Sequence, residues 1–354
     1  MQHQVARPIF VVDDPLFDEH RARGYHPERP ERLLAARHAL TALSGASTQP
    51  LAPRDATATE LGLVHHAPYI EELARLSGLF GALDDDTYLG PRSVAAAYRA
   101  AGGALALSDA LSGETDARLG VALVRPPGHH ARPDGGMGFS LLNNVALAAA
   151  NALARGVSRV AIVDWDVHHG NGTQEAFYAD PRVLFVSLHQ APFYPGTGGT
   201  ADLGAGEGKG FNVNVPLSPN AGDATYRAVF DRIVTPVLDA YAPELIFISA
   251  GFDAHARDPL AGMVLSADGF RHLAASVRGV AERHAKGRVG VFLEGGYDLE
   301  GLESSLGATL SALTGLAVAS PPVAAADAEA PPLSTRHGHD IHRAEKALAP
   351  YWKL

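Results

Sequence analysis

Four polar clusters each follow a short apolar segment, and their residue types suit acid–base or metal chemistry. The clusters are RPPGHH (125–130), DWDVHHGNG (164–172), GFDAH (251–255) and EGGYD (294–298). The segments before them, at 119–124, 159–163, 245–250 and 289–293, are rich in branched apolar residues and indicate buried strands. Ligands bind at the carboxyl ends of parallel strands, so we expect all four clusters to meet on one edge of a sheet.

Two of these clusters contain candidate metal ligands. Asp166 and His168 are two residues apart, so in an extended chain their side chains share a face. With Asp253 they would leave one coordination position open, as a catalytic zinc requires. The chain has no cysteine, which excludes disulfides and thiolate sites, and such ligands also suit Fe²⁺, Mn²⁺ or Co²⁺. One Asp-x-His motif alone more often caps a helix, but four clusters together favour a metal site.

The other two clusters offer proton-transfer groups. His129 and His130 follow a Pro-Pro-Gly turn and are candidates for general base and general acid, because imidazole titrates near neutrality. A lone pair of histidines is usually a surface feature, but the rigid turn before this pair favours a function. Tyr297 follows two glycines and could donate a hydrogen bond to a developing oxyanion. A tyrosine packed on a turn is an equally good interpretation of that fragment alone.

Alternating elements must position these residues. Strands are predicted at 8–14, 119–128, 159–166, 182–190, 210–217, 244–253 and 288–297, and helices at 29–43, 91–113, 141–156, from about 173, 223–241, 266–285 and 306–316. The pattern predicts a single three-layer αβα domain with a mostly parallel sheet over residues 1–316. An Ala/Pro-rich linker (317–332) and a C-terminal tail (333–354) that packs on the domain should follow.

Composition excludes several classes of protein. Among 354 residues the net charge is −10, which disfavours nucleic-acid binding because phosphate recognition needs a basic surface. Hydrophobic residues make up 46%, enough for a large core. We expect no signal peptide, no membrane span and a cytoplasmic location. The Ala-rich, cysteine-free composition suggests a bacterial source.

The motifs together resemble the histone deacetylase superfamily, and within it the class II-like bacterial amidohydrolases. The matching segments are YHPERPERL (25–33), VHHAPYI (64–70), DDDTYLGPRS (84–93), RPPGHHA (125–131), GMGFSLLNNVALAA (136–149), IVDWDVHHGNGTQ (162–174), VSLHQ (186–190), NVPL (214–217), ISAGFDAHARDPLAGM (248–263) and FLEGGYD (292–298). They occur in family order across roughly residues 10–316. The resemblance implies the arginase/deacetylase fold, with an eight-stranded, mostly parallel sheet.

The resemblance also implies a role for each site residue. Zinc would bind Asp166, His168 and Asp253; His130 would be the general base and His129 its electrostatic partner or acid; Tyr297 would polarise the amide carbonyl; Asp164 and Asn171 would support the tandem histidines. Phe139 and Gly138 would line an acyl-lysine tunnel with a second wall at Phe193 or Phe252, and Leu260 and Asp86 would lie at its rim. Arg29 would line an internal channel, and Asp164, Asp166, His168, Ser187 and Leu188 would hold a structural K⁺ or Na⁺.

The implied activity is removal of acetyl or other acyl groups from lysine, in a protein, a peptide or a small amine. An acetylpolyamine amidohydrolase is the alternative, but Leu260 offers nothing to pair with a free ammonium group. A catalytically silent acyl-lysine binder is less consistent with an intact ligand set and Tyr297. A binuclear arginase-like enzyme is disfavoured because His169 stands where another carboxylate ligand would be needed. A homo-oligomer is compatible with the resemblance.

Overall fold

Eight parallel strands form the centre of the molecule. The structure is a computed structural model that describes residues 8–113, 118–318 and 332–354, so most of the expected linker lies outside the described residues. The strands are β1 (Ile9–Val12), β2 (Thr48–Pro50), β5 (Leu119–Ala122), β6 (Val160–Asp164), β7 (Val183–Gln190), β8 (Asn212–Leu217), β9 (Leu245–Ala250) and β10 (Val289–Leu293). Their order is β2-β1-β5-β10-β9-β6-β7-β8, and every neighbouring pair is parallel. The predicted α/β fold with an eight-stranded sheet is therefore confirmed.

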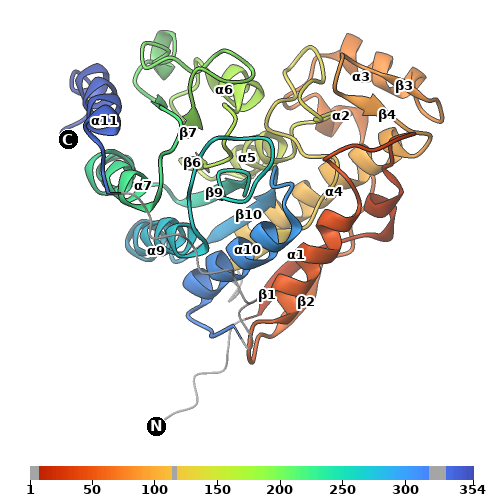
Figure 1. The fold of residues 1–354 in the computed structure, drawn as a ribbon. Coiled ribbons are helices and arrows are strands. Elements are labelled where there is room, and N and C mark those ends of the chain that lie inside the picture. Colours follow the sequence, from red (N-terminus) through yellow and green to blue (C-terminus); the bar gives the residue numbers. More distant parts are fainter. Residues whose placement is uncertain (1–7, 114–117, 319–331) are drawn as a thin grey trace.

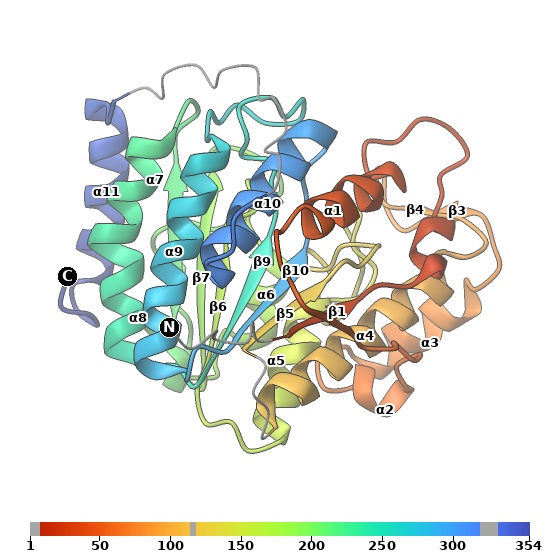
Figure 2. The ribbon, with the colours of Figure 1, turned by 90° about the horizontal axis from the view of Figure 1, so that it is seen from below.

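Helices cover both faces of this sheet. They are α1 (Glu31–Thr41), α2 (Ala58–Leu61), α3 (Ala67–Arg75), α4 (Ser93–Ser112), α5 (Asn144–Ala154), α6 (Asn171–Phe177), α7 (Asp223–Val229), α8 (Thr235–Tyr241), α9 (Ala267–His284), α10 (Leu299–Thr314) and α11 (Thr335–Leu348). Figure 2 shows α4 and α5 on one face and α1, α10 and α9 on the other. Apart from the exposed edge strand β2, the strands are buried on both faces, which explains why their sequences are largely apolar rather than alternating.

The edges of the molecule differ from each other. A small antiparallel pair, β3 (Gly81–Ala82) and β4 (Tyr88–Leu89), lies with α2 and α3 on one side, while α11 lies on the opposite side (Figure 1). Helix α11 packs against the edge strand β8 through its buried residues Ile341, Ala344 and Leu348. No helix among the described residues is both long and apolar enough to cross a membrane.

The predicted helix at 223–241 is interrupted by a π-helical stretch. Residues Phe230–Val234 separate α7 from α8, and Pro236 follows directly in the first turn of α8. Proline has no backbone N–H, so the regular hydrogen bond to the carbonyl four residues earlier is missing at this point. The helical path nevertheless continues and keeps its buried face on the core.

Candidate active site

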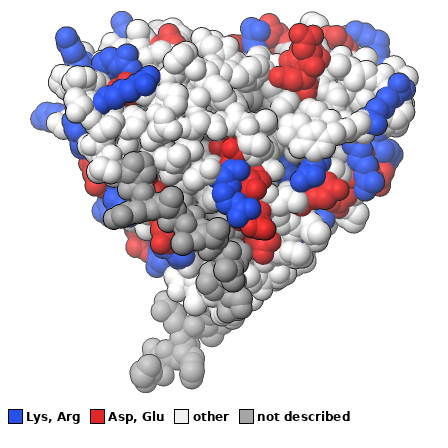
Figure 3. Space-filling view, in the orientation of Figure 1, with Lys and Arg blue, Asp and Glu red and all other residues white. Residues whose placement is uncertain are grey.

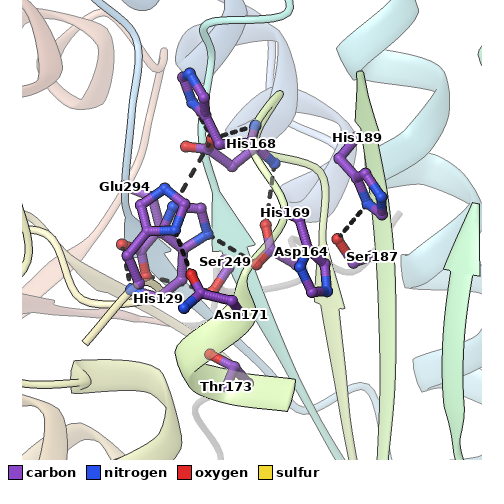
Figure 4. Close-up of polar contacts among 12 residues, drawn as sticks. His129, Asp164, His168, His169, Asn171, Thr173, Ser187, His189, Ser249 and Glu294 are labelled. Carbon is purple, nitrogen blue, oxygen red and sulfur yellow. Dashed lines mark hydrogen bonds and ion pairs between the residues drawn. The ribbon is translucent and has the colours of Figure 1, made fainter. Parts of the chain in front are cut away.

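The four polar clusters lie at the carboxyl ends of four adjacent strands. His129 and His130 follow β5, Tyr297 follows β10, Asp253 follows β9, and Asp166 follows β6. The order β5-β10-β9-β6 runs through the middle of the sheet, so the parallel strands deliver all four loops to one place. Figure 4 shows several of these side chains gathered above the strand ends.

Asp166, His168 and Asp253 form the most compact cluster. All three offer ligand atoms within 4.8 Å of one another. Nδ1 of His168 lies 3.1 Å from Oδ1 of Asp166 and 3.1 Å from Oδ2 of Asp253. Both aspartates are buried, and burial together with the charge of Asp166 raises the pKa of Asp253 to about 7. Two buried carboxylates around one imidazole fit a divalent cation, because a cation would compensate their charges.

Backbone groups hold the two aspartates in place. Oδ1 of Asp253 accepts a hydrogen bond from the N–H of Val167 at 2.8 Å, and Oδ2 of Asp166 accepts one from Gly295 at 2.8 Å. A Cβ atom at Gly295 would stand 2.2 Å from Oδ2 of Asp253. Only glycine therefore allows the loop after β10 to approach the carboxylates this closely.

The two tandem histidines have different partners. Nδ1 of His129 lies 2.9 Å from Oδ2 of Asp164, and Nδ1 of His130 lies 2.8 Å from Oδ1 of Asn171. An amide oxygen only accepts, so Nδ1 of His130 carries the hydrogen and Nε2 is left as a proton acceptor.

The pKa values of His129 and His130 are shifted in opposite directions because the two histidines have different partners. Burial disfavours the charged form of His129, but the carboxylates of Asp164 and Asp166 outweigh it and raise the pKa to about 10. Burial, with the neighbouring His129 and His168, holds the pKa of His130 well below its usual 6.5. Asn171 adds no negative charge to offset this, so the pair contains one cationic and one neutral imidazole.

Tyr297 lies between an aromatic ring and a guanidinium group. The ring centroid of Tyr297 is 5.9 Å from that of Phe139. Cζ of Arg32 lies 5.0 Å from the Tyr297 ring centroid. The backbone N–H of Tyr297 donates to Oδ2 of Asp258 at 2.7 Å. Burial raises the pKa of Tyr297 well above 10, so its hydroxyl remains a hydrogen-bond donor.

Aromatic rings surround the cluster. Phe193 stacks on His168 with ring centroids 5.2 Å apart, whereas Phe252 is 1% exposed and packs on Phe270. Of the two candidates for the second wall, Phe193 is therefore the one beside the ligands. Sequence reasoning missed Tyr194, whose ring lies edge-on to His130 and His168 at 5.3 and 6.1 Å.

Gly138 and Phe139 lie against the same site. Both have positive φ angles, 55° and 67°, and a Cβ at Gly138 would stand 2.4 Å from the His130 ring. The N–H of Phe139 donates to the hydroxyl of Thr87, which in turn donates to Oδ1 of the exposed Asp86. Asp86 is thus exposed to solvent and linked to Phe139 through Thr87, and its role at a tunnel rim stays a prediction.

Three further predicted residues lie in the loop after β9 or within strand β7. Leu260 is half-buried, and its N–H donates to Oδ1 of Asp258, the residue that also holds Tyr297. Ser187 pairs with Asp164 across β7 and β6, and Leu188 follows it on β7.

The arginine beneath the site is Arg32 and not Arg29. Arg29 is half-buried and borders a surface hollow, whereas Arg32 is fully buried in the first turn of α1. Arg32 donates to the carbonyls of Glu294 and Gly296, on either side of Gly295, and to Oε1 of Glu28 at 3.0 Å. Both arginines occur in the segment HPERPER, and only the start of the helix decides which one turns inward.

Glu28 and Glu294 were also missed, although both contact the loops that carry the candidate site residues. Glu28 is fully buried and accepts hydrogen bonds from Arg32 and from Arg125, the residue before the Pro-Pro-Gly turn. Oε2 of Glu294 accepts from the N–H groups of Gly128 and His129 at 2.7 and 3.1 Å. Glu294 lies in the EGGYD cluster, so its proximity to the active site could have been inferred from the sequence.

Comparisons with known proteins agree on one family. A family model described as the histone deacetylase domain matches residues 26–313. A probable deacetylase of Archaeoglobus fulgidus is 41% identical over 286 residues, covering 80% of this chain and 79% of the relative. A histone deacetylase-like amidohydrolase of Pseudomonas aeruginosa is 50% identical over 238 residues, covering 66% of this chain and 62% of the relative.

A solved structure supports the same assignment. The crystal structure of the HDA15 HD domain aligns with a TM-score of 0.87 and 35% identity, covering 98% of this chain and 96% of that one. The family match spans the loops that carry the tandem histidines, the Asp-His-Asp cluster and Tyr297. The chain therefore belongs to the histone deacetylase family of hydrolases.

Proposed function

We propose that the chain is a zinc-dependent hydrolase that removes acetyl or other acyl groups from lysine side chains. One observation carries this proposal: a buried Asp-His-Asp cluster, two differently charged imidazoles and a tyrosine hydroxyl meet between aromatic rings. Hydrolysis of an amide requires water activation, oxyanion stabilisation and proton delivery to the amine, and this group of residues is equipped for all three.

Asp166, His168 and Asp253 would hold the zinc ion. Bound there, zinc would supply a Lewis acid for the acyl carbonyl and for water. The donor set of one imidazole and two carboxylates supports this choice, although it also suits other divalent metals. Asp164, Asp166, His168, Ser187 and Leu188 would hold a structural K⁺ or Na⁺, in keeping with the pairing of Asp164 and Ser187 across two strands.

The chain's own residues would divide the remaining work. His130 would accept a proton at Nε2 from the attacking water, because its Nδ1 already donates to Asn171. His129, kept cationic by Asp164, would stabilise negative charge and supply the proton for the leaving amine. The hydroxyl of Tyr297 would donate to the carbonyl oxygen as it becomes negative.

Aromatic walls suit the aliphatic stem of an acylated lysine. Phe139 and Phe193 would enclose the methylene groups, and the exposed carboxylate of Asp86 would accept backbone N–H groups of a peptide at the rim. Leu260 would add an apolar contact beside Tyr297. An acylated lysine has lost its charge, so it enters such an apolar tunnel without the desolvation penalty of an ammonium group.

Acetylpolyamine hydrolysis is the second candidate, because one side of the rim is acidic. Asp84, Asp85 and Asp86 are consecutive, and the latter two are exposed. Carboxylates there could pair with the free ammonium groups of a polyamine. The apolar Leu260 argues against this alternative, and acyl-lysine remains the favoured substrate.

The deciding experiment is a turnover panel with zinc-loaded protein. It compares peptides carrying acetyl-lysine and longer acyl-lysines with acetylated polyamines, each with and without a hydroxamate inhibitor. We expect hydroxamate-sensitive release from acyl-lysine to be fastest. Faster release from acetylpolyamines would favour the second candidate, and no release from any amide despite bound zinc would contradict a hydrolytic function.

A further inference from the structure

A hollow of about 730 Å³ lies beside the active site. One wall is the loop 191–200, which follows β7, and the other is the first half of α11. Phe193 belongs to both places, because it borders the hollow and also stacks on His168. The hollow is therefore one aromatic ring away from a candidate metal ligand.

The loop wall is fixed relative to the active site. The hydroxyl of Thr197 lies 2.7 Å from Nδ1 of His169, the residue next to His168. Nε2 of His189 donates to the carbonyl of Gly198 at 2.9 Å. These two hydrogen bonds and the stacked Phe193 hold the loop at several points, so the hollow is positioned together with the catalytic residues.

The helical wall is held as firmly by the edge of the sheet. Oδ2 of Asp340 accepts a hydrogen bond from the N–H of Ser218, directly after β8, at 2.9 Å. Glu345 forms an ion pair with Arg232 at 2.7 Å, and Ile341 is fully buried. Helix α11 thus presents the same side chains to the hollow in a fixed register.

Those side chains make the hollow cationic. Arg336, His339 and Arg343 line it, and Asp340 is the one acidic residue among its lining residues. Asp340 pairs with Arg343 at 2.8 Å, while exposed Arg336 has no ion-pair partner among the residues that the structure describes. Figure 3 shows Lys and Arg atoms gathered at the upper left, where Figure 1 places α11.

Three consecutive aspartates lie on the opposite side of the molecule's upper rim. Asp84, Asp85 and Asp86 lie between β3 and β4, across the active site from α11 (Figure 1). A peptide whose acylated lysine enters the active site would therefore meet acidic groups on one side and arginines on the other. A charged side chain of the peptide that reaches either group would be attracted or repelled according to its sign.

We propose that this hollow binds an acidic side chain, Asp or Glu, that flanks the acylated lysine in a peptide or protein substrate. The proposal rests on the proposed acyl-lysine activity and adds a sequence preference to it. Arg336 is the main recognition residue because it has no ion-pair partner among residues 8–113, 118–318 and 332–354, and Arg343 supports it while it remains paired with Asp340.

Binding of fluorescent acetyl-lysine peptides tests the proposal without relying on turnover. Matched peptides carry Glu or Gln two to four residues from the acetyl-lysine, and anisotropy gives their Kd values with the metal-loaded full chain. We expect the best-placed Glu peptide to bind at least about 5-fold more tightly at low salt, with the difference shrinking at 0.5 M salt because exposed charges are screened. Equal Kd values for every Glu/Gln pair would overturn the proposal.

Two charge reversals on the same helix sharpen this test. Arg336→Glu should abolish the preference for the Glu peptide, whereas Lys346→Glu, exposed on α11 outside the hollow, should preserve it. A glutamate in the first turn of a helix is favourable, so Arg336→Glu should fold normally. A preference that survives Arg336→Glu would overturn the assignment.

Hydrolysis of the same peptides separates the two proposals. A Glu preference in binding without release of acetate from any peptide would support the hollow and contradict the proposed function. If acetate is released from Glu and Gln peptides with equal KM and equal Kd, the result would support the proposed function and contradict the binding of an acidic side chain in the hollow.

Discussion

At the scale of single residues, the proposed function gives the hydroxyl of Tyr297 one role, donation of a hydrogen bond to the carbonyl oxygen. Tyr297→Phe removes this hydroxyl and keeps the ring that packs on Phe139 and faces Arg32. We expect kcat on an acetyl-lysine peptide to fall by about 10²–10³-fold, as for the loss of one oxyanion donor, while KM and zinc content stay near the parent values. Steady-state kinetics with metal analysis of the same samples measures this, and an unchanged kcat would remove Tyr297 from the mechanism.

Asp253 provides the matching test of the metal site. Asp253→Asn keeps the size of the side chain and its acceptor for the N–H of Val167 but removes one of two ligand charges. Zinc occupancy after dialysis should drop well below one per chain, and activity should fall with it. Asp268→Asn, on an exposed aspartate of α9, should leave both unchanged. Full occupancy in Asp253→Asn would contradict its assignment as a ligand.

Residue identities near the site were only partly predictable. The tandem histidines, the Asp-His-Asp cluster and Tyr297 occur in motifs that follow strands, so sequence order was enough to place them together. Arg32 could not be distinguished from Arg29, because the choice depends on which residue of the first turn of α1 faces inward. The aromatic ring of Tyr194 was missed because only the path of the loop 191–200 brings it over His130.

At the scale of elements, one buried carboxylate connects the two loops that carry the tandem histidines and Tyr297. Glu28 contacts Arg125, before the tandem histidines, and Arg32, which holds the loop before Tyr297. Glu28→Gln would leave two buried guanidinium groups without their counter-charge, so we expect a loss of about 3–5 kcal/mol in the free energy of unfolding. Urea titration measures this loss.

An exposed neighbour provides the control for that experiment. Glu31→Gln, at the start of α1, should change the free energy of unfolding by no more than about 0.5 kcal/mol, as is usual for surface substitutions. Equal stability of Glu28→Gln and Glu31→Gln would show that the buried network is unimportant for folding.

Elements were predicted best where burial imposes a clear pattern. Seven of the eight strands of the sheet were expected, and their apolar runs reflect burial on both faces. The eighth strand, β2, reads Thr-Gln-Pro and is exposed, so nothing in its sequence distinguishes it from a loop. Helix α10 begins at Leu299 and not near 306, because Asp298 caps it by accepting a hydrogen bond from Gly301.

At the scale of the whole molecule, a parallel sheet collects distant residues at one edge. Each of the four clusters directly follows a strand in the sequence, so their convergence at one edge of a parallel sheet could be predicted. The cationic hollow could not, because it requires the last helix of the chain to lie beside the loop after β7. That arrangement depends on packing of α11 against the edge strand β8, which local sequence patterns do not specify.

Buried neutral histidines should make the stability of the whole molecule depend on pH. Burial lowers the pKa of His65 to about 4, that of His189 to about 4 and that of His20 to about 3. His65 uses both ring nitrogens, with the carbonyl of Arg132 and the N–H of Asn143, which only the neutral form allows. Below about pH 6.5 the unfolded chain binds protons at these sites and the folded chain does not, so the stability that these histidines contribute is lost as pH decreases towards 4.

The adjacent residues His65 and His66 allow this pH dependence to be assigned. Between pH 6.5 and 5, each such histidine should lower the free energy of unfolding, measured by urea titration, by up to about 1.4 kcal/mol per unit decrease in pH, while buried carboxyls whose pKa is raised to about 7, Asp253 and Glu294, contribute in the opposite direction. His65→Gln should remove the contribution of one histidine from the pH dependence of the free energy of unfolding. His66→Gln, at an exposed position, should leave that pH dependence unchanged. If neither variant changes the pH dependence of the free energy of unfolding, His65 must have the same pKa in the folded and unfolded chain. The two hydrogen bonds of the neutral His65 ring are incompatible with that outcome.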